Sequence, residues 1–279
     1  STDQAVTLSG TQEYHNQANG NGLTVISRGF VTISNVIANA NGGDGVHIDN
    51  LLSFTNQGVT VGGTNTFNDN AYGLFVLSHG IITTSNLSAS RNGADGVHLD
   101  NCETTSTCSV IGAPYVNVTG DNYFNYNKGN GLYVSSFGQI MTNNLSASCN
   151  GYLNAIGNTY CASPNVVGNE KNGAYLKNQW HSTIGDIESA GTITLNGINF
   201  FNNNSLDGLN AASNFDIVAY NVTASDNGNN GAILTVNRDQ PAPVPYYIRV
   251  RVNRKYKYVL AYNYVTDANI ALYGTSNFE

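Results

Sequence analysis

The sequence predicts an all-β protein built as a parallel β-helix, a rod in which each coil of the chain pairs with the next. The first observation is a recurring segment that starts with Gly and an apolar-x-apolar triplet. The second is the alternation of short apolar stretches with Asn and Gly turns, which tolerate positive φ. Helical periodicity is almost absent. We expect a rod of about 8–9 coils followed by a C-terminal β-strand extension.

Two unit types alternate along the repeat. The first begins like GLTVIS and continues like FVTISNVIANAN, whereas the second begins like GVHIDN and ends like GVTVGGTNTFNDN. Within each start, the apolar residues of the triplet are expected to point inward and to stack from coil to coil. The repeats start at Gly22, Gly45, Gly73, Gly96, Gly131, Gly173, Gly208 and Gly231. The first inward row is Leu23, Val46, Leu74, Val97 and Leu132.

One row of asparagines suggests a side-chain ladder. Asn35, Asn86, Asn144 and Asn221 each lie 13 residues after a repeat Gly, so we expect them to stack inward with each amide bonding the next. Three of these four also begin N-x-S/T sequons. Because an inward amide could not carry a sugar, the better candidate glycosylation sites are the two remaining sequons, at Asn117 and Asn203.

The repeat resembles that of the right-handed parallel β-helix proteins of the pectin-lyase-like superfamily. The resemblance rests on GLxVxS, NLSAS and GVxLDN and covers about residues 6–236. In style it is closest to repetitive secreted microbial surface proteins. It implies a single-stranded, right-handed helix and says little about function. Pectin-cleaving hydrolases of this fold resemble one another in clustered Asp pairs, a Gly-His-Gly and an Arg-x-Lys, which this chain lacks in that context. We therefore expect no catalytic residues, no metal site and no cofactor.

A His and an Asp recur in GVHIDN and GVHLDN, which raises the question of a metal or catalytic site. His47 and His98 fall in one outward row with Phe75 between them, about 10 Å apart and too far for one metal ion. A duplicated repeat with polar outward residues explains the pattern most simply, and Asp44 and Asp95 are interpreted as turn residues. Calcium binding by these Asp residues, catalysis and a glycan-binding row stay open. The row would comprise Phe75, Tyr133 and Tyr175.

The four cysteines fall into two pairs, each of which brackets an insertion in the repeat. We predict disulfides Cys102–Cys108 and Cys149–Cys161, each closing a loop that bulges from the rod. Disulfides persist in oxidising compartments, so they imply an extracellular or cell-surface protein.

Charge divides the chain into an acidic body and a basic tail. The chain up to Asn237 carries fifteen acids against five bases, and the remainder three against six. An acidic body disfavours nucleic acid, and no apolar run is long enough for membrane insertion. We expect a rod over 1–237, a Pro-rich linker over 238–245 and a basic, Tyr-rich extension over 246–279.

The extension is expected to form strands that either cap its own rod or pair with a neighbouring subunit, and both alternatives stay open. The N-terminal segment enters the repeat within a unit, which would leave an unpaired edge for such pairing. The residues of the expected assembly strand are Tyr247, Arg249, Arg251, Arg254, Lys255, Lys257 and Tyr258.

The leading functional hypothesis is a non-catalytic, secreted structural protein, either a filament subunit or a cell-surface adhesin. Its main partner would be copies of itself, joined by β-strand addition or head-to-tail stacking. The alternative is a polysaccharide-binding or polysaccharide-degrading β-helix protein.

Overall fold

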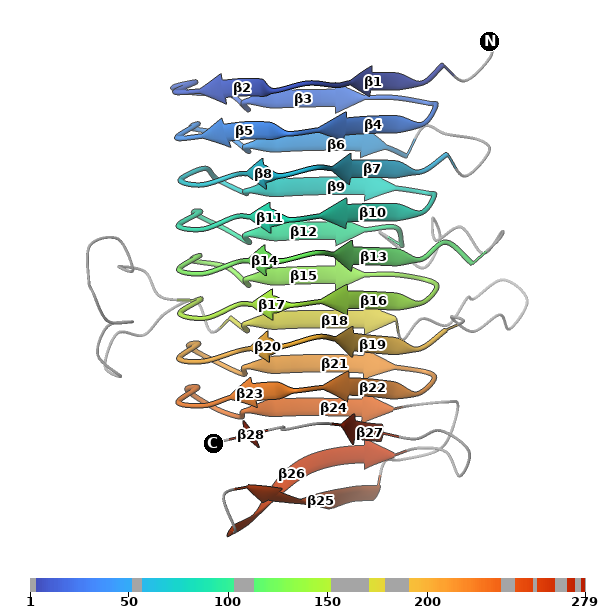
Figure 1. Cartoon of the computed structure of the whole chain (residues 1–279), viewed down its shortest axis with the longest axis vertical. Coiled ribbons are helices and arrows are strands. Elements are labelled where there is room, and N and C mark those ends of the chain that lie inside the picture. The colour runs from blue at the N-terminus through green and yellow to red at the C-terminus, as the bar shows by residue number, and fades with distance from the viewer. Residues whose placement is uncertain are drawn as a thin grey trace.

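The computed structural model describes residues 4–51, 57–102, 113–151, 171–178, 191–236, 244–252, 255–263, 270–273 and 277–278, with side chains up to Val236. The chain forms a right-handed parallel β-helix, which confirms the predicted fold class (Figure 1). Each coil contributes one strand to each of three sheets, which we call A, B and C. Within the described ranges, no helix is long and apolar enough to span a membrane.

Sheets A and B each contain nine parallel strands stacked in chain order. Sheet A consists of β1 (Val6–Leu8), β4 (Val31–Ser34), β7 (Val59–Gly62), β10 (Ile82–Ser85), β13 (Val116–Thr119), β16 (Ile140–Asn143), β19 (Ile193–Asn196), β22 (Ile217–Tyr220) and β27 (Ile270–Tyr273). Sheet B consists of β2 (Gln12–His15), β5 (Val36–Asn39), β8 (Asn65–Thr66), β11 (Leu87–Ser88), β14 (Asn122–Tyr123), β17 (Leu145–Ser146), β20 (Asn199–Phe200), β23 (Val222–Ala224) and β28 (Asn277–Phe278).

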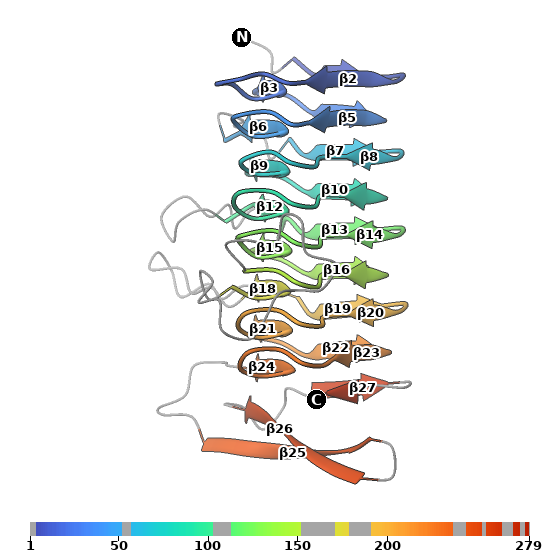
Figure 2. The ribbon, with the colours of Figure 1, turned by 90° about the vertical axis from the view of Figure 1, so that its left-hand side faces the viewer.

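Sheet C contains ten strands, of which the first eight are seen end-on in Figure 2, apart from sheets A and B. Its first eight strands are those that follow the repeat glycines, so GVHIDN and GVHLDN lie on it. In order, the ten strands are β3 (Leu23–Ile26), β6 (Val46–Asn50), β9 (Leu74–Ser78), β12 (Val97–Asp100), β15 (Leu132–Ser135), β18 (Ala174–Asn178), β21 (Leu209–Ser213), β24 (Ala232–Val236), β26 (Lys255–Asn263) and β25 (Val244–Val252).

The two unit types are explained by how successive coils fill the core. One inward position lies at the end of each sheet B strand or directly after it. At this position Phe and Ala alternate from coil to coil, and all are fully buried. At the position two residues earlier, Asn in the Phe coils alternates with Val or Leu in the Ala coils. Large and small side chains thus compensate along the axis, as dense packing requires. The alternating residues are Phe67, Ala89, Phe124, Ala147, Phe201 and Ala224.

The expected inward ladder of Asn35, Asn86, Asn144 and Asn221 is wrong. These asparagines have φ of 46–55° and lie exposed or half-buried at the corner between sheets A and B. They alternate with Gly63, Gly120 and Gly197, also at positive φ, where a Cβ would clash with the Asn side chain of the preceding coil. The three sequons on this row are therefore not excluded by burial. Asn117 and Asn203 are half-buried, and glycosylation there stays a prediction.

A different row of asparagines, the last residue of each unit, forms the buried ladder. Five of its side-chain amides donate to the carbonyl of the next Asn at 2.9–3.1 Å. Because a buried amide is costly without partners, this ladder fixes the axial register of the coils. Its members are Asn41, Asn70, Asn92, Asn127, Asn150, Asn204 and Asn227.

The C-terminal extension lies on its own rod. β26, β27 and β28 pair parallel with β24, β22 and β23, and so add a further coil. β25 pairs antiparallel with β26 and forms the outer edge of sheet C. Tyr247, Arg249 and Arg251 lie on β25, whereas Lys255, Lys257 and Tyr258 lie on β26. Arg254 lies outside the described residues, as do 237–243, which cover most of the expected linker.

The predicted disulfides cannot be traced within the described part of the chain. Cys102 and Cys149 are buried where their coils meet the two insertions, and neither is a free thiol. Their predicted partners Cys108 and Cys161 lie outside the described residues. The pairing therefore stays a prediction.

Candidate functional site

Five aromatic or imidazole rings form one row on the outer face of sheet C, with one ring on each strand from β6 to β18. Neighbouring ring centroids lie 4.3–5.4 Å apart, and their planes differ by 10–21°. The strand register places Phe75 between the two histidines, as the repeat predicts. In order, the ring stack consists of His47, Phe75, His98, Tyr133 and Tyr175.

The rings of this stack overlap face to face along the rod. Near-parallel rings at these distances cannot lie flat beside one another, because a ring is wider than the spacing between strands. Most of each inner face is therefore covered by the neighbouring ring. The stack presents ring edges, imidazole nitrogens and tyrosine hydroxyls to solvent, and it stabilises the coils that carry it.

Each histidine of the stack is held by a carboxylate from the turn before its strand. Nδ1 of His47 lies 2.8 Å from Oδ2 of Asp44, and Nδ1 of His98 lies 3.1 Å from Oδ2 of Asp95. Since an ionised carboxylate only accepts, the Nδ1–H is the donor, which leaves Nε2 directed away from the pair. The residues interpreted from the sequence as plain turn residues therefore orient the imidazoles.

A polar ladder runs along the corner where the turns enter sheet C. At most coils, the residue before the repeat Gly offers a side-chain oxygen to the backbone N–H of its counterpart on the next coil, at 2.7–3.2 Å. The ladder comprises Asn21, Asp44, Asp95, Asn130, Asn172, Asp207 and Asn230, with Tyr72 in the place between Asp44 and Asp95.

Tyr72 interrupts this ladder. Its ring lies crosswise against Phe75 and His98, with centroids at 5.2 and 6.0 Å, and it offers no oxygen to the next coil. Among the described residues, none accepts a hydrogen bond from the backbone N–H of Asp95. The interruption thus leaves a hydrogen-bond donor free beside the ring stack.

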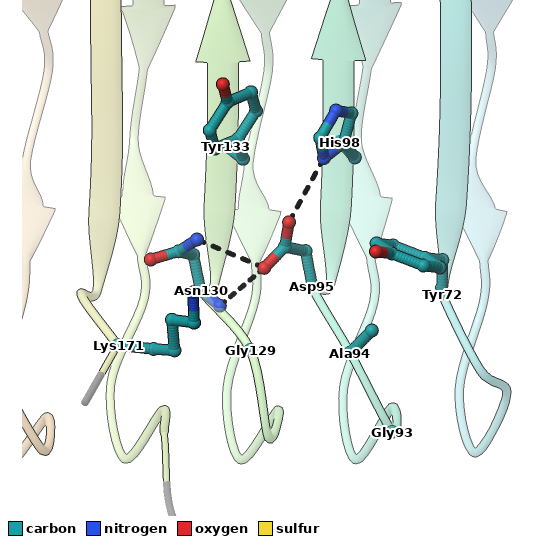
Figure 3. A pocket seen from close by; sticks show the side chains of 9 residues that line it. All are labelled: Tyr72, Gly93, Ala94, Asp95, His98, Gly129, Asn130, Tyr133 and Lys171. Atoms are coloured by element: carbon teal, nitrogen blue, oxygen red, sulfur yellow. Dashed lines mark hydrogen bonds and ion pairs between the residues drawn. The ribbon is translucent and has the colours of Figure 1, made fainter. Parts of the chain in front are cut away.

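A depression of about 350 Å³ opens at this interruption. Figure 3 shows Asp95 at its centre, bound to His98 on one side and to Asn130 on the other. The turns at its edge contain Gly93 and Gly129, which have no side chain to cover the depression. Its principal lining side chains come from four consecutive coils and are Tyr72, Asp95, His98, Asn130, Tyr133 and Lys171.

The tyrosines of the site remain protonated at neutral pH. Burial, with a further contribution from Asp100, raises the pKa of Tyr133 to about 12. Burial also raises the pKa of Tyr72, beside Asp95 and Asp44, and that of Tyr175. All three hydroxyls can therefore donate a hydrogen bond to a ligand.

The structure brings Phe75, Tyr133 and Tyr175 together as the sequence predicts, but only Tyr133 lines the depression. Sequence reasoning missed Tyr72, Asn130 and Lys171. The residue before each repeat Gly was the available signal, because Tyr stands there once among Asn and Asp. Within the described ranges, no group of three or more His, Cys, Asp or Glu side chains could hold a metal ion.

The chain matches no protein-family model, no curated protein and no solved structure.

Proposed function

We propose that this protein is a non-catalytic, extracellular rod that binds a glycan along the outer face of sheet C. The observation that carries the proposal is the depression at Tyr72, where the ring stack meets the interrupted polar ladder. A resemblance of the repeat to the pectin-lyase-like superfamily agrees with a sugar ligand, and an extracellular location rests on the predicted disulfides.

The chemistry of the depression suits a sugar. A sugar ring has apolar C–H faces and a rim of hydroxyls, so it requires aromatic surface beside paired donors and acceptors. Tyr72 and Tyr133 supply the aromatic surface, whereas the Asp95 N–H, the tyrosine hydroxyls and the Lys171 ammonium supply donors. Such a mixture of apolar walls and few placed polar groups is typical of ligand sites.

The shape of the depression favours an extended ligand. Its lining spans four coils, or about 14 Å along the axis at the usual strand spacing. The ring stack continues the same face beyond it to Tyr175. A polysaccharide chain that lies along the rod could therefore use several coils at once.

A panel of neutral, amino and acidic oligosaccharides tests this proposal by calorimetry. Tyr133→Ala and Tyr72→Ala are expected to weaken binding about tenfold each, the effect of one lost aromatic contact. Asn210→Ala is the matched control, because Asn210 lies in the same outward row on β21, outside the depression. No binding of any probe, or equal affinity in all variants, would remove the proposal.

A second candidate function is assembly through β25. This strand is nine residues long, and among the described residues no strand pairs with its outer edge. Such an edge is a template for strand addition from a second copy. Electron microscopy of the purified protein is expected to show filaments if β25 acts in this way, whereas rods that stay single at high concentration would argue against it.

A further inference from the structure

The alternation of the two unit types makes the outer surface of sheet B uneven. Coils with Gly at the corner carry one extra residue after it, such as Asp121 or Ile198, whereas coils with Asn at the corner lack it. On the coils of Asn86 and Asn144, the outward residue that follows is also small, Ser88 and Ser146 respectively. Each of these two coils is therefore a recess between two higher coils.

One recess has aromatic walls on both sides. Strand register places Ser146 of β17 directly between Tyr123 of β14 and Phe200 of β20, three strands that follow one another along the rod (Figure 1). Tyr123 and Phe200 are 52% and 43% exposed, and together with Ile198 they form one contiguous exposed apolar patch, a feature typical of interaction sites. They border a hollow of about 270 Å³ that is also lined by Ile198, Leu145, Asn144 and Asp121.

The spacing of the two walls leaves room for one ring between them. Tyr123 and Phe200 are two strand spacings apart, about 10 Å. On sheet C, the same scaffold places one ring on every coil, with centroids 4.3–5.4 Å apart. The row Tyr123–Ser146–Phe200 therefore lacks one ring, and a ligand can supply it.

The rim of the hollow identifies the kind of ring. Asp121 is exposed, and its Oδ1 accepts from the Asn144 amide at 2.9 Å. A wholly apolar guest would remove water from this carboxylate without replacing its hydrogen bonds, which costs free energy. A sugar ring places C–H faces on the two aromatic walls and hydroxyls at the rim. An acidic sugar would be repelled by Asp121.

We propose that the hollow between Tyr123 and Phe200, which we call the sheet B slot, binds one pyranose ring of a neutral or amino sugar. The slot lies on a different face from the depression at Tyr72. The inference rests on the proposed function for its ligand class, but its residues and its test are separate.

The first test is an NMR titration of the full chain with cellobiose, N,N′-diacetylchitobiose and digalacturonate. The first or second disaccharide is expected to shift the ring signals of Tyr123 and Phe200, and digalacturonate is not. Tyr123→Ala and Phe200→Ala are expected to weaken binding at the slot about tenfold each. Both side chains are exposed, so both variants should fold.

Two further variants exploit the repeat itself. Ser146→Tyr should fill the slot with a ring at the spacing seen on sheet C and abolish binding there. Ser88→Tyr is the matched control, since Ser88 lies in a recess between Thr66 and Tyr123 that has one aromatic wall. Thr66→Tyr should complete that recess, and so raise the number of disaccharides bound on sheet B from one to two.

The outcomes separate the slot from the function proposed for sheet C. If sugars bind but the Tyr123, Phe200 and Ser146 variants bind equally well, the slot is wrong even where Tyr133→Ala abolishes binding. If only the slot variants lose binding, the slot stands and the sheet C site fails. If no probe binds the wild-type chain, both proposals fail.

Discussion

Oδ1 of Asp95 accepts two hydrogen bonds from Asn130 on the next coil, one from the backbone N–H at 2.7 Å and one from the side-chain amide at 3.1 Å. Its Oδ2 meanwhile holds His98. The same carboxylate therefore links two coils and orients a ring of the stack.

Asp95→Ala should destabilise the rod by about 1–3 kcal/mol, because the amide and N–H of Asn130 lose their acceptor in a buried place. Asp95→Asn keeps one carbonyl oxygen and should lose less. Urea unfolding measures both. Wild-type midpoints for both variants would contradict the role assigned to this carboxylate.

The alternation of Phe and Ala in the core predicts a large cavity effect. Phe124 is fully buried between Ala89 and Ala147 of the adjoining coils. Phe124→Ala should therefore cost about 3–5 kcal/mol in unfolding free energy. Phe200→Ala removes an equal side chain from the surface and should change stability by less than about 0.5 kcal/mol. Similar losses in the two variants would mean that the alternation does not fill the core.

The buried asparagine ladder should be sensitive at each rung. Oδ1 of Asn127 accepts from both the backbone N–H and the side-chain amide of Asn92, so Asn127→Ala removes a buried acceptor from the preceding coil, whereas Asn150 keeps its bond from the Asn127 N–H. We expect a loss of about 2 kcal/mol or more. Asn117→Ala, on the outer face of sheet A, is the control and should be nearly neutral. Equal thermal midpoints for the two variants would contradict a stabilising ladder.

The raised pKa of Tyr133 predicts a loss of stability at high pH. Its pKa is about 12 in the fold, against an ordinary value of 10.0. Between these values the folded state keeps a proton that the unfolded state has released, so stability is fully present below pH 10 and falls as pH rises toward 12. Tyr133→Phe should show a smaller fall in melting temperature between pH 9.5 and 11.5. An identical fall would show that Tyr133 does not titrate late.

Much of the fold could be predicted from the sequence because residues at equivalent positions of the repeat lie side by side in neighbouring coils. The apolar-x-apolar triplets after each Gly set the register of sheet C, and that register placed Phe75 between His47 and His98. The asparagines were harder, since the same amide can cap a corner at positive φ or bond within the core. Asn86, 13 residues after Gly73, does the first, and Asn92, 19 residues after it, does the second, but neither spacing indicates which amide faces the core.

The sites were less visible because each depends on an exception to the repeat. Tyr72 matters since it breaks a ladder of Asn and Asp, which becomes evident only when the hydrogen bonds of neighbouring coils are known. Likewise, strand register places Tyr123 and Phe200 on either side of Ser146, although a long insertion separates β17 from β20 in the sequence. Residues far apart in sequence thus become neighbours along the axis.

The central claim is that a glycan binds at the depression beside Tyr72. The most direct measurement is the backbone amide signal of Asp95 during titration with the oligosaccharide that the panel selects. We predict a saturable shift of this signal, together with those of Tyr72 and Asn130, as the ligand accepts the free N–H. An Asp95 signal that stays in place while the ligand binds elsewhere, or while no ligand binds at all, would contradict the claim.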